Sequence, residues 1–234
     1  MFISLVIPTF NEAENISIII DKIFNILKHN GLNGEVIVVD DDSPDGTWEI
    51  AERLKTVYNI KVLRRLDKRG LSSAVIDGFK IASGDIIGVM DADMSHPPEK
   101  IPELLEPIIS NKSDMVIGSR YVEGARIENW PFRRKVSSKI AALLVRALTD
   151  VKDPMAGFFF FRRGVIEGLT LSPQGFKIGL EILVKSRCKN VTEVPILFGD
   201  REFGDSKLDL RVIFEDFIHI AKLYLIKYTN SGQC

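Results

Sequence analysis

The stretch that decides the fold is Val36-Ile37-Val38-Val39-Asp40-Asp41-Asp42-Ser43-Pro44-Asp45-Gly46. It opens with a continuous β-branched run, which is typical of a parallel strand buried on both faces. It closes with carboxylates and a turn signal, which end the strand. A second apolar run, Ile86–Met90, is followed by Asp91-Ala92-Asp93. Two buried strands that end in carboxylates predict an α/β protein with polar groups at the carboxyl edge of its sheet.

Outward from this stretch, apolar runs alternate with amphipathic segments. The runs predict strands over Ile3–Ile7, Glu35–Asp40, Ile60–Leu63, Asp85–Met90 and Asp114–Gly118. Helical spacing of apolar residues predicts helices over Glu12–Leu27, Trp48–Val57 (with Thr47 as its N-cap), Leu71–Ala82 and Pro98–Ile109. This order predicts a Rossmann-like, mostly parallel sheet with helices on both faces.

The second half of the chain is less regular. It predicts strands over Phe158–Phe161 and Val191–Phe198, and helices over Phe132–Leu148, Phe176–Lys185 and Leu208–Tyr228. The sequence shows no internal repeat and no linker rich in Pro, Gly or Ser. We therefore expect one fold unit over residues 1–234.

Composition excludes several classes of protein. A chain of 234 residues with 45% hydrophobic and 27% charged residues is neither disordered nor a disulfide scaffold. Its net charge of -1 gives no basic excess for nucleic acid, so any anion site must be local. Cys188 and Cys234 have no zinc or disulfide spacing, which suits a reducing compartment. No apolar run reaches the ~18 residues of a membrane span, and the N-terminus lacks the features of a signal peptide.

Acidic or polar clusters follow three of the predicted strands, at Pro8–Glu12, Asp40–Gly46 and Asp91–Asp93. Carboxylates gathered at one edge repel each other unless a cation is present, and oxygen ligands suit Mg²⁺ or Mn²⁺. The alternative is that such residues cap the next helix, which stays open for Asp45. His96 lies beside the third cluster, and its role is open between structural and direct. Fingerprints of dinucleotide-binding, phosphate-loop and serine-hydrolase sites are missing.

Eight blocks, spread over residues 3–210, resemble family-2 inverting glycosyltransferases of the GT-A type. Within that family they are similar to the dolichyl- or polyprenyl-phosphate mannosyltransferases. The blocks are Val6–Asn15, Val38–Thr47, Lys68–Ala74, Asp91–Glu99, Gly118–Tyr121, Asp153–Phe159, Glu193–Ile196 and Arg201–Leu208. The resemblance implies a GT-A catalytic domain, with a nucleotide-sugar-binding half at 1–120 and an acceptor-side half at 121–234.

The resemblance also implies residue roles. It assigns the nucleotide sugar to Pro8, Thr9, Asn11, Glu12, Val39, Asp40, Asp42, Lys68, Gly70, Leu71 and Ala92. It assigns a divalent cation, Mg²⁺ or Mn²⁺, to Asp91, Asp93 and Ser95, the last standing where many archaeal members carry Gln. The acceptor phosphate is assigned to Arg120, Arg134, Arg201, Ser206 and Lys207. Catalysis is expected from Asp91, Asp93, Arg120, Arg134 and Arg201.

The chemistry of the acceptor explains why cations are expected on that side. A hydroxyl acceptor needs a carboxylate base, whereas a lipid phosphate is already an anion and needs cations to position it. Hydroxyl-acceptor relatives carry a late Gln/Arg-x-x-Arg-Trp motif, and neither Trp48 nor Trp130 follows that pattern. We therefore expect mannose transfer from GDP-mannose to a polyprenyl or dolichyl phosphate. UDP-glucose as donor, or a non-catalytic nucleotide- or lipid-phosphate-binding module, are the alternatives.

A lipid acceptor implies a membrane surface. We expect a protein that is peripheral on the cytoplasmic face, binds no nucleic acid, and docks through Phe132–Leu148 or, better, Leu208–Tyr228 with Leu223 and Leu225. For most of their length both apolar faces are expected to pack on the sheet. Some members of the family append transmembrane helices, so an anchoring partner subunit or a missing C-terminal region is also expected.

Overall fold

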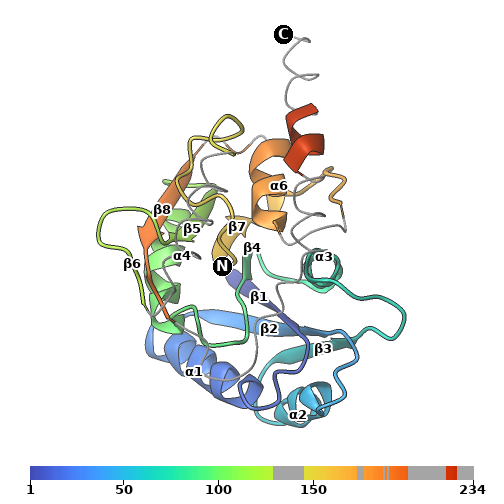
Figure 1. Cartoon of the computed structure of the whole chain (residues 1–234). Coiled ribbons are helices and arrows are strands. Elements are labelled where there is room, and N and C mark those ends of the chain that lie inside the picture. The colour runs from blue at the N-terminus through green and yellow to red at the C-terminus, as the bar shows by residue number, and fades with distance from the viewer. Residues whose placement is uncertain (129–144, 173–176, 187, 189, 200–219, 226–234) are drawn as a thin grey trace.

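The computed structural model of the protein describes residues 1–128, 145–172, 177–186, 188, 190–199 and 220–225. Its centre is a seven-stranded sheet of order β3-β2-β1-β4-β7-β5-β8, surrounded by helices (Figure 1). The strands are β1 (Phe2–Thr9), β2 (Asn33–Asp40), β3 (Ile60–Arg64), β4 (Ile86–Val89), β5 (Met115–Ser119), β7 (Phe159–Arg162) and β8 (Val191–Pro195). A second sheet pairs β6 (Arg126–Ile127) with β9 (Leu197–Phe198).

Helices cover both faces of the main sheet. They are α1 (Ile16–His29), α2 (Thr47–Leu54), α3 (Leu71–Ile81), α4 (Ile101–Ile109) and α6 (Ile178–Lys185), with 3-10 turns at Pro98–Lys100 and Arg163–Val165. Residues 220–225 are also helical.

Successive strand residues point to opposite faces and pack into different clusters. Val36 and Val38 pack in one cluster with residues of α1, α2 and α4, whereas Ile37 and Val39 pack in another with residues of α3 and α6. The phenylalanines of β7 and the one before it alternate in the same way: Phe158 and Phe160 pack in the first cluster, and Phe159 and Phe161 pack in the second. Burial on both sides is the reason these strands are apolar without interruption.

Most predicted elements are present, with differences that have physical causes. Strand β7 is antiparallel to both β4 and β5, so the sheet is parallel everywhere except there. Helix α1 begins at Ile16, because Glu12 opens a turn in which its carbonyl accepts the N–H groups of Asn15 and Ile16. Helix α2 ends at Leu54, where the N–H groups of Val57 and Tyr58 share the Leu54 carbonyl and close the last turn.

The single strand predicted over Val191–Phe198 is wrong. Strand β8 pairs with β5 until Pro195 lies opposite Ser119, where β5 ends, and β9 then pairs with β6. The helix predicted over Phe132–Leu148 lies outside the described residues except for 145–148, which form turns. The helix predicted over Leu208–Tyr228 is described only over 220–225. Within the described part of the chain, no helix has the length and apolar character needed to cross a membrane.

Candidate active site

The ends of β1 and β2 are joined by the carboxylate of Asp40. Its Oδ2 accepts the hydroxyls of Thr9 and Ser43, each at 2.7 Å, and its Oδ1 accepts the Ser43 N–H at 2.8 Å. The side chain is fully buried. The Asn11 N–H then donates to the Ser43 hydroxyl at 3.0 Å, which ties the β1 loop to the β2 loop. Thr9, Asn11 and Asp40, which are predicted nucleotide-sugar residues, therefore belong to one hydrogen-bond network at this edge.

Asp45 fastens the outer part of the same two loops. Its carboxylate accepts the Thr47 hydroxyl at 2.6 Å and the N–H groups of Thr47 and Ala13, each at 3.0 Å. Burial alone would raise its pKa, but these donors outweigh burial and lower it. Thr47 was predicted to be the N-cap of α2. It is instead the first residue of the helix, and Gly46, at φ 85°, is the N-cap. These contacts fit the capping alternative for Asp45.

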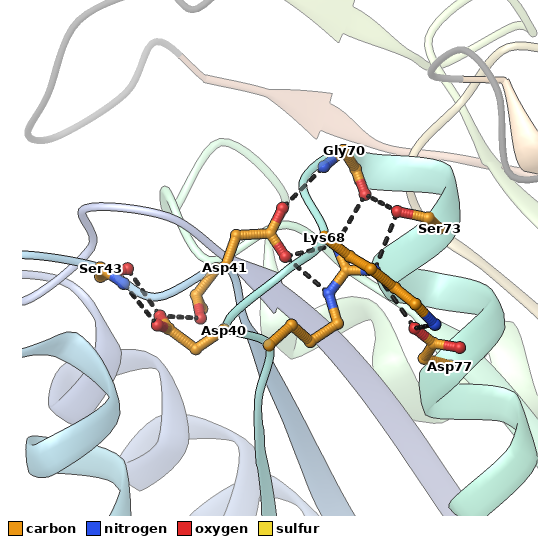
Figure 2. Close-up of polar contacts among 9 residues, drawn as sticks. Asp40, Asp41, Ser43, Lys68, Gly70, Ser73 and Asp77 are labelled. Carbon is orange, nitrogen blue, oxygen red and sulfur yellow. Dashed lines mark hydrogen bonds and ion pairs between the residues drawn. The ribbon is translucent and has the colours of Figure 1, made fainter.

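A buried arginine to which the sequence analysis gave no role, Arg65, joins the loops after β2 and β3 to helix α3. Nε of Arg65 donates to Asp41 Oδ1 at 2.7 Å, and Nη2 also pairs with that oxygen. Nη1 contacts the Ser73 hydroxyl at 2.8 Å and Asp77 Oδ2 at 3.3 Å. The second oxygen of Asp41 accepts the Gly70 N–H at 2.7 Å, and Figure 2 shows Asp41 facing Gly70. Arg65 thus binds the end of β2 to the start of α3.

This arrangement places the predicted donor residues Lys68, Gly70 and Leu71. Gly70 has φ 126°, a conformation that favours glycine, and Leu71 begins α3 immediately after it. Lys68 is exposed, and its Nζ lies 3.6 Å from Asp77 (Figure 2).

The neighbouring side chains at this edge also pair charge with aromatic rings. Asp42 pairs with Arg64 at 2.6 Å, and the Arg64 guanidinium lies 4.1 Å from the centre of the Trp48 ring. The Arg69 guanidinium lies 5.3 Å from the centre of the Phe10 ring. Cationic and aromatic groups therefore lie together beside the ends of β1, β2 and β3.

The loop after β4 carries the predicted cation site. Asp93 Oδ1 accepts the Ser95 hydroxyl at 2.6 Å and the Ser95 N–H at 3.1 Å. Met94 between them has φ 63°, and Ala92 is buried. Asp91 is partly exposed at its side chain, while Asp93 is buried. Within the described residues, no three His, Cys, Asp or Glu side chains form a metal-binding group. Two carboxylates and a hydroxyl fit a hard divalent cation that completes its shell with phosphate oxygens and water.

His96 packs behind this loop. It is buried between Phe158 and Phe198, with ring centroids 5.4 and 5.1 Å away. Burial lowers its pKa to about 4, although the charge of Asp93 raises it, so the ring is neutral at pH 7. Its Nδ1 has no hydrogen-bond partner among the described residues and lies 3.8 Å from Asp91 Oδ2.

Arg120, at the end of β5, is held by a second buried carboxylate. Its Nε and Nη2 donate to the two oxygens of Asp153, each at 2.7 Å, and its N–H donates to Oδ2 at 2.9 Å. Burial lowers the pKa of the guanidinium, but Asp153 and the charge of Asp91 outweigh burial and raise it, so Arg120 stays cationic. Its Cζ lies 5.4 Å from the ring centres of both Tyr121 and Phe198.

The described structure therefore brings together the predicted residues of the β1, β2, β4 and β5 ends. Four of the predicted acceptor residues lie outside the described residues: Arg134, Arg201, Ser206 and Lys207. The sequence analysis gave no role to Arg65, Asp153 or Glu193. A signal existed for each of them, because Arg65 lies two residues after a predicted strand and the other two lie in the quoted blocks.

Comparison with known proteins gives two kinds of match. The profile described as glycosyl transferase family 2 matches residues 4–170. A dolichol-phosphate mannosyltransferase of Pyrococcus furiosus is 53% identical over 95% of this chain and 64% of its own length. This chain thus spans just under two thirds of that relative. A protein of the same name from Saccharomyces cerevisiae is 36% identical over 96% of this chain and 88% of its own length.

Solved structures share the fold. A glucosyl-3-phosphoglycerate synthase of Mycobacterium tuberculosis, crystallised with Mn²⁺, UDP-glucose and phosphoglyceric acid, superposes with a TM-score of 0.71 at 20% identity. The match covers 97% of this chain and 79% of that one. A mannosyl-3-phosphoglycerate synthase of Rubrobacter xylanophilus gives 0.66 at 19% identity, covering 100% and 76%. These likenesses confirm the predicted fold class.

Proposed function

Because the chain belongs to glycosyl transferase family 2, we propose that it transfers mannose from GDP-mannose to dolichyl or polyprenyl phosphate, with inversion. The observation that carries this proposal is the occurrence of two sites at the carboxyl ends of β4 and β5, the two strands that flank β7. Oxygen ligands for a cation, Asp91, Asp93 and Ser95, follow β4, and the partly buried cation Arg120 follows β5. The names of the archaeal and fungal relatives support this reaction.

On the donor side, the loops after β1, β2 and β3 would hold the nucleotide. The Asp40 junction and the Arg65 network fix these loops before any ligand arrives, which lowers the entropic cost of binding. We assign residues 1–120 to the donor half and residues 121–234 to the acceptor half. Pro8, Glu12, Val39 and Ala92 remain predicted contacts of the nucleotide sugar.

A divalent cation, Mg²⁺ or Mn²⁺, is proposed at Asp91, Asp93 and Ser95. When bound, it supplies charge neutralisation for the diphosphate leaving group. The residues here fit it, because Asp93 is preorganised by Ser95 and the Asp91 side chain is 35% exposed. The Mn²⁺ in the mycobacterial crystal structure supports this choice of ion.

The reaction breaks the bond between the anomeric carbon and the diphosphate oxygen, and the bonding electrons leave with GDP. An oxygen of the lipid phosphate forms the new bond on the opposite face, through an oxocarbenium-like transition state. That oxygen is already anionic, so no protein group needs to remove a proton. Arg120 would hold the attacking phosphate, and Arg134, Arg201, Ser206 and Lys207 are the further predicted contacts.

The lipid acceptor places the enzyme at a membrane. We propose that it is peripheral on the cytoplasmic face, with Leu225 as an exposed apolar contact. Leu223 is not available for this role, because it is 1% exposed and packs with Val145, Leu148 and Leu180. An anchoring partner subunit or a further membrane segment is proposed as an additional attachment.

The proposal is tested by incubating the protein with Mg²⁺ or Mn²⁺, a short polyprenyl phosphate and either GDP-mannose or UDP-glucose. Release of GDP together with mannosyl lipid is expected. Turnover with UDP-glucose alone would move the donor to the glucose alternative, and nucleotide binding without turnover would indicate a binding module. The matching prenyl alcohol should not replace the phosphate, because no base is provided for it.

A further inference from the structure

Arg120 is linked through Asp153 to a further carboxylate, which has no assigned part in the proposed substrate sites. Glu193, on β8, accepts the Asp153 N–H at 2.9 Å through Oε1 and the Lys152 N–H at 2.8 Å through Oε2. Asp153 in turn takes two N–H groups of the Arg120 guanidinium, each at 2.7 Å. Glu193 in the middle of β8 and Arg120 just after β5 thereby both hold the start of the segment 152–157.

The same segment also touches the cation side of the site. Gly157 lies so close to Asp91 that a Cβ at this position would be 3.0 Å from Asp91 Oδ2 and 3.3 Å from His96 Cε1. One short stretch of backbone therefore fixes the Arg120 guanidinium at one end and packs against the Asp91 carboxylate at the other.

We propose that Glu193 and Asp153 are positioning residues that set the distance between Arg120 and the Asp91 carboxylate. This inference rests on the proposed function, because that distance matters only if an acceptor anion and a cation-bound diphosphate meet there. Charge alone does not require such a device, since a guanidinium stays cationic without a partner. Placement does require it, because an arginine side chain loses considerable rotamer freedom when it is held in one geometry.

The order of the contacts gives the order of the expected effects. Asp153 is 1% exposed and bonds Arg120 directly, whereas Glu193 acts only through the backbone N–H groups of 152 and 153. Asp153→Asn keeps the shape but cannot accept both N–H groups through equivalent oxygens. Glu193→Gln can accept only one of its two N–H groups in the same way.

We expect Glu193→Gln to lower kcat about tenfold and Asp153→Asn about a hundredfold, through misplacement of the attacking group. The affinity for GDP, measured by calorimetry, should stay within about twofold, because neither residue contacts the donor loops. The double variant should be no slower than Asp153→Asn alone, because both residues act through one chain of contacts. Equal losses of GDP affinity and kcat, or additive losses in the double variant, would overturn the proposal.

Glu167→Gln is the matched control. It removes the same charge from an exposed side chain just past the end of β7. Because β7 is antiparallel and Arg162 pairs with Ile86, that end lies at the edge of the sheet opposite to the site. Its kcat should equal that of the unchanged protein.

A readout independent of turnover separates this inference from the proposed function. In ¹⁵N NMR spectra, the Nε–H of Arg120 should exchange slowly with water in the unchanged protein and fast in both variants. If no nucleotide sugar and prenyl phosphate react, the proposed function fails, while this exchange still decides whether Glu193 holds Arg120. Slow exchange retained in Glu193→Gln would overturn the positioning role directly.

Discussion

Two arginines, the buried Arg65 and the partly buried Arg120, pair with carboxylates at the same edge of the sheet but differ in their other surroundings. All three side-chain nitrogens of Arg65 donate hydrogen bonds, to Asp41, Ser73 and the Gly70 carbonyl. Its side chain is only 3% exposed. Nε and Nη2 of Arg120 bond to the two oxygens of Asp153, and its side chain is 11% exposed between two aromatic rings. The Arg65–Asp41 pair is buried and fixes the turn at Gly70. The Arg120–Asp153 pair holds the guanidinium in place beside the proposed cation site. The comparison teaches that the partners of a buried ion pair, rather than its burial, separate a structural pair from a functional one.

The largest effect is expected between the two pairs, at Asp93. Asp93→Asn keeps the side-chain shape and the contact with Ser95 but removes the charge that would hold the cation, so turnover should fall about a thousandfold. EDTA should have the same effect, reversed by adding Mn²⁺. Circular dichroism and the unfolding midpoint should change little.

Asp67→Asn, an exposed position on the donor loop, is the control for charge. Full activity of Asp93→Asn, or of the unchanged protein in EDTA, would contradict the assignment of the cation site.

The next effect tests the functional pair. Arg120→Lys keeps the positive charge but cannot make the two-pronged bond to Asp153, so kcat should fall about a hundredfold. GDP affinity should stay within about twofold, and steady-state kinetics with calorimetry separate the two quantities. A loss confined to GDP affinity would move Arg120 to the donor side and remove the contrast.

The third effect tests the structural pair. Arg65→Lys leaves Asp41 with fewer bonds, and we expect the free energy of unfolding to fall by about 2 kcal/mol. GDP should bind about tenfold more weakly because the Gly70 turn loosens, while kcat at saturating substrate changes less than threefold. Urea unfolding and calorimetry measure these quantities. An unchanged GDP affinity would show that the Arg65 network does not support the donor loops.

The sequence predicted residues 1–120 better than residues 121–234, for physical reasons. In residues 1–120, local patterns suffice, because a buried parallel strand is a continuous apolar run and a helix repeats its apolar residues every three or four positions. The family prediction is confirmed by the match over residues 4–170. The edge carrying Thr9, Asp40 and Asp91 followed from the rule that strand ends gather functional groups.

The described part of residues 121–234 depends on contacts that no local pattern reveals. Direction is one example, because an apolar run such as Phe158–Phe161 fits a parallel or an antiparallel strand equally well. Pairing is another, because Arg120 and Asp153 are 33 residues apart. Leu223 and Leu225 were predicted to share a docking face, but residues two apart on a helix point to different sides, and only Leu225 is exposed.

Glu35 is a buried carboxylate at the opposite edge of the sheet, near the start of β2. It has no proposed part in the reaction, so it can be compared with the two carboxylates that pair with Arg65 and Arg120. The Glu35 carboxylate accepts hydrogen bonds from the hydroxyls of Ser4 and Ser83 and pairs with Lys61. Burial alone would raise the pKa of Glu35, but these donors outweigh burial and lower it to about 2. Its folded pKa lies below the unfolded value, so its stabilisation is complete above about pH 5 and is lost as the pH falls toward 2.

We expect Glu35→Gln to lower the free energy of unfolding by about 2 kcal/mol at pH 7 and to flatten the decline in stability between pH 5 and 3. Urea unfolding at a series of pH values measures both. Activity at pH 7 and 25 °C should be retained, in contrast with Arg120→Lys. An unchanged pH slope would show that Glu35 is not held in this way.

The smallest effect concerns the membrane, where the acceptor side is proposed to meet its lipid. Leu225 is 67% exposed on the helical residues 220–225, and Lys222 is exposed beside it. An apolar side chain next to a basic one favours an anionic bilayer surface, with an attraction that salt screens. Partial insertion of one leucine contributes at most the ~2 kcal/mol of full burial, so Leu225→Ser should weaken liposome binding about threefold.

Two variants serve as controls for the liposome-binding measurement on Leu225→Ser. Val57→Ser removes an apolar side chain that is 69% exposed just beyond α2, and it should leave liposome sedimentation unchanged. Leu223→Ser instead opens the cluster with Val145 and Leu180, so it should lower the unfolding midpoint more than it changes lipid binding. Because residues 222 and 225 lie one helical turn apart, salt and Leu225→Ser should act on the same contact. Binding that Leu225→Ser leaves unchanged at low salt would place the lipid contact on another surface, and the link between the Arg120 side of the site and the bilayer would then run through that surface.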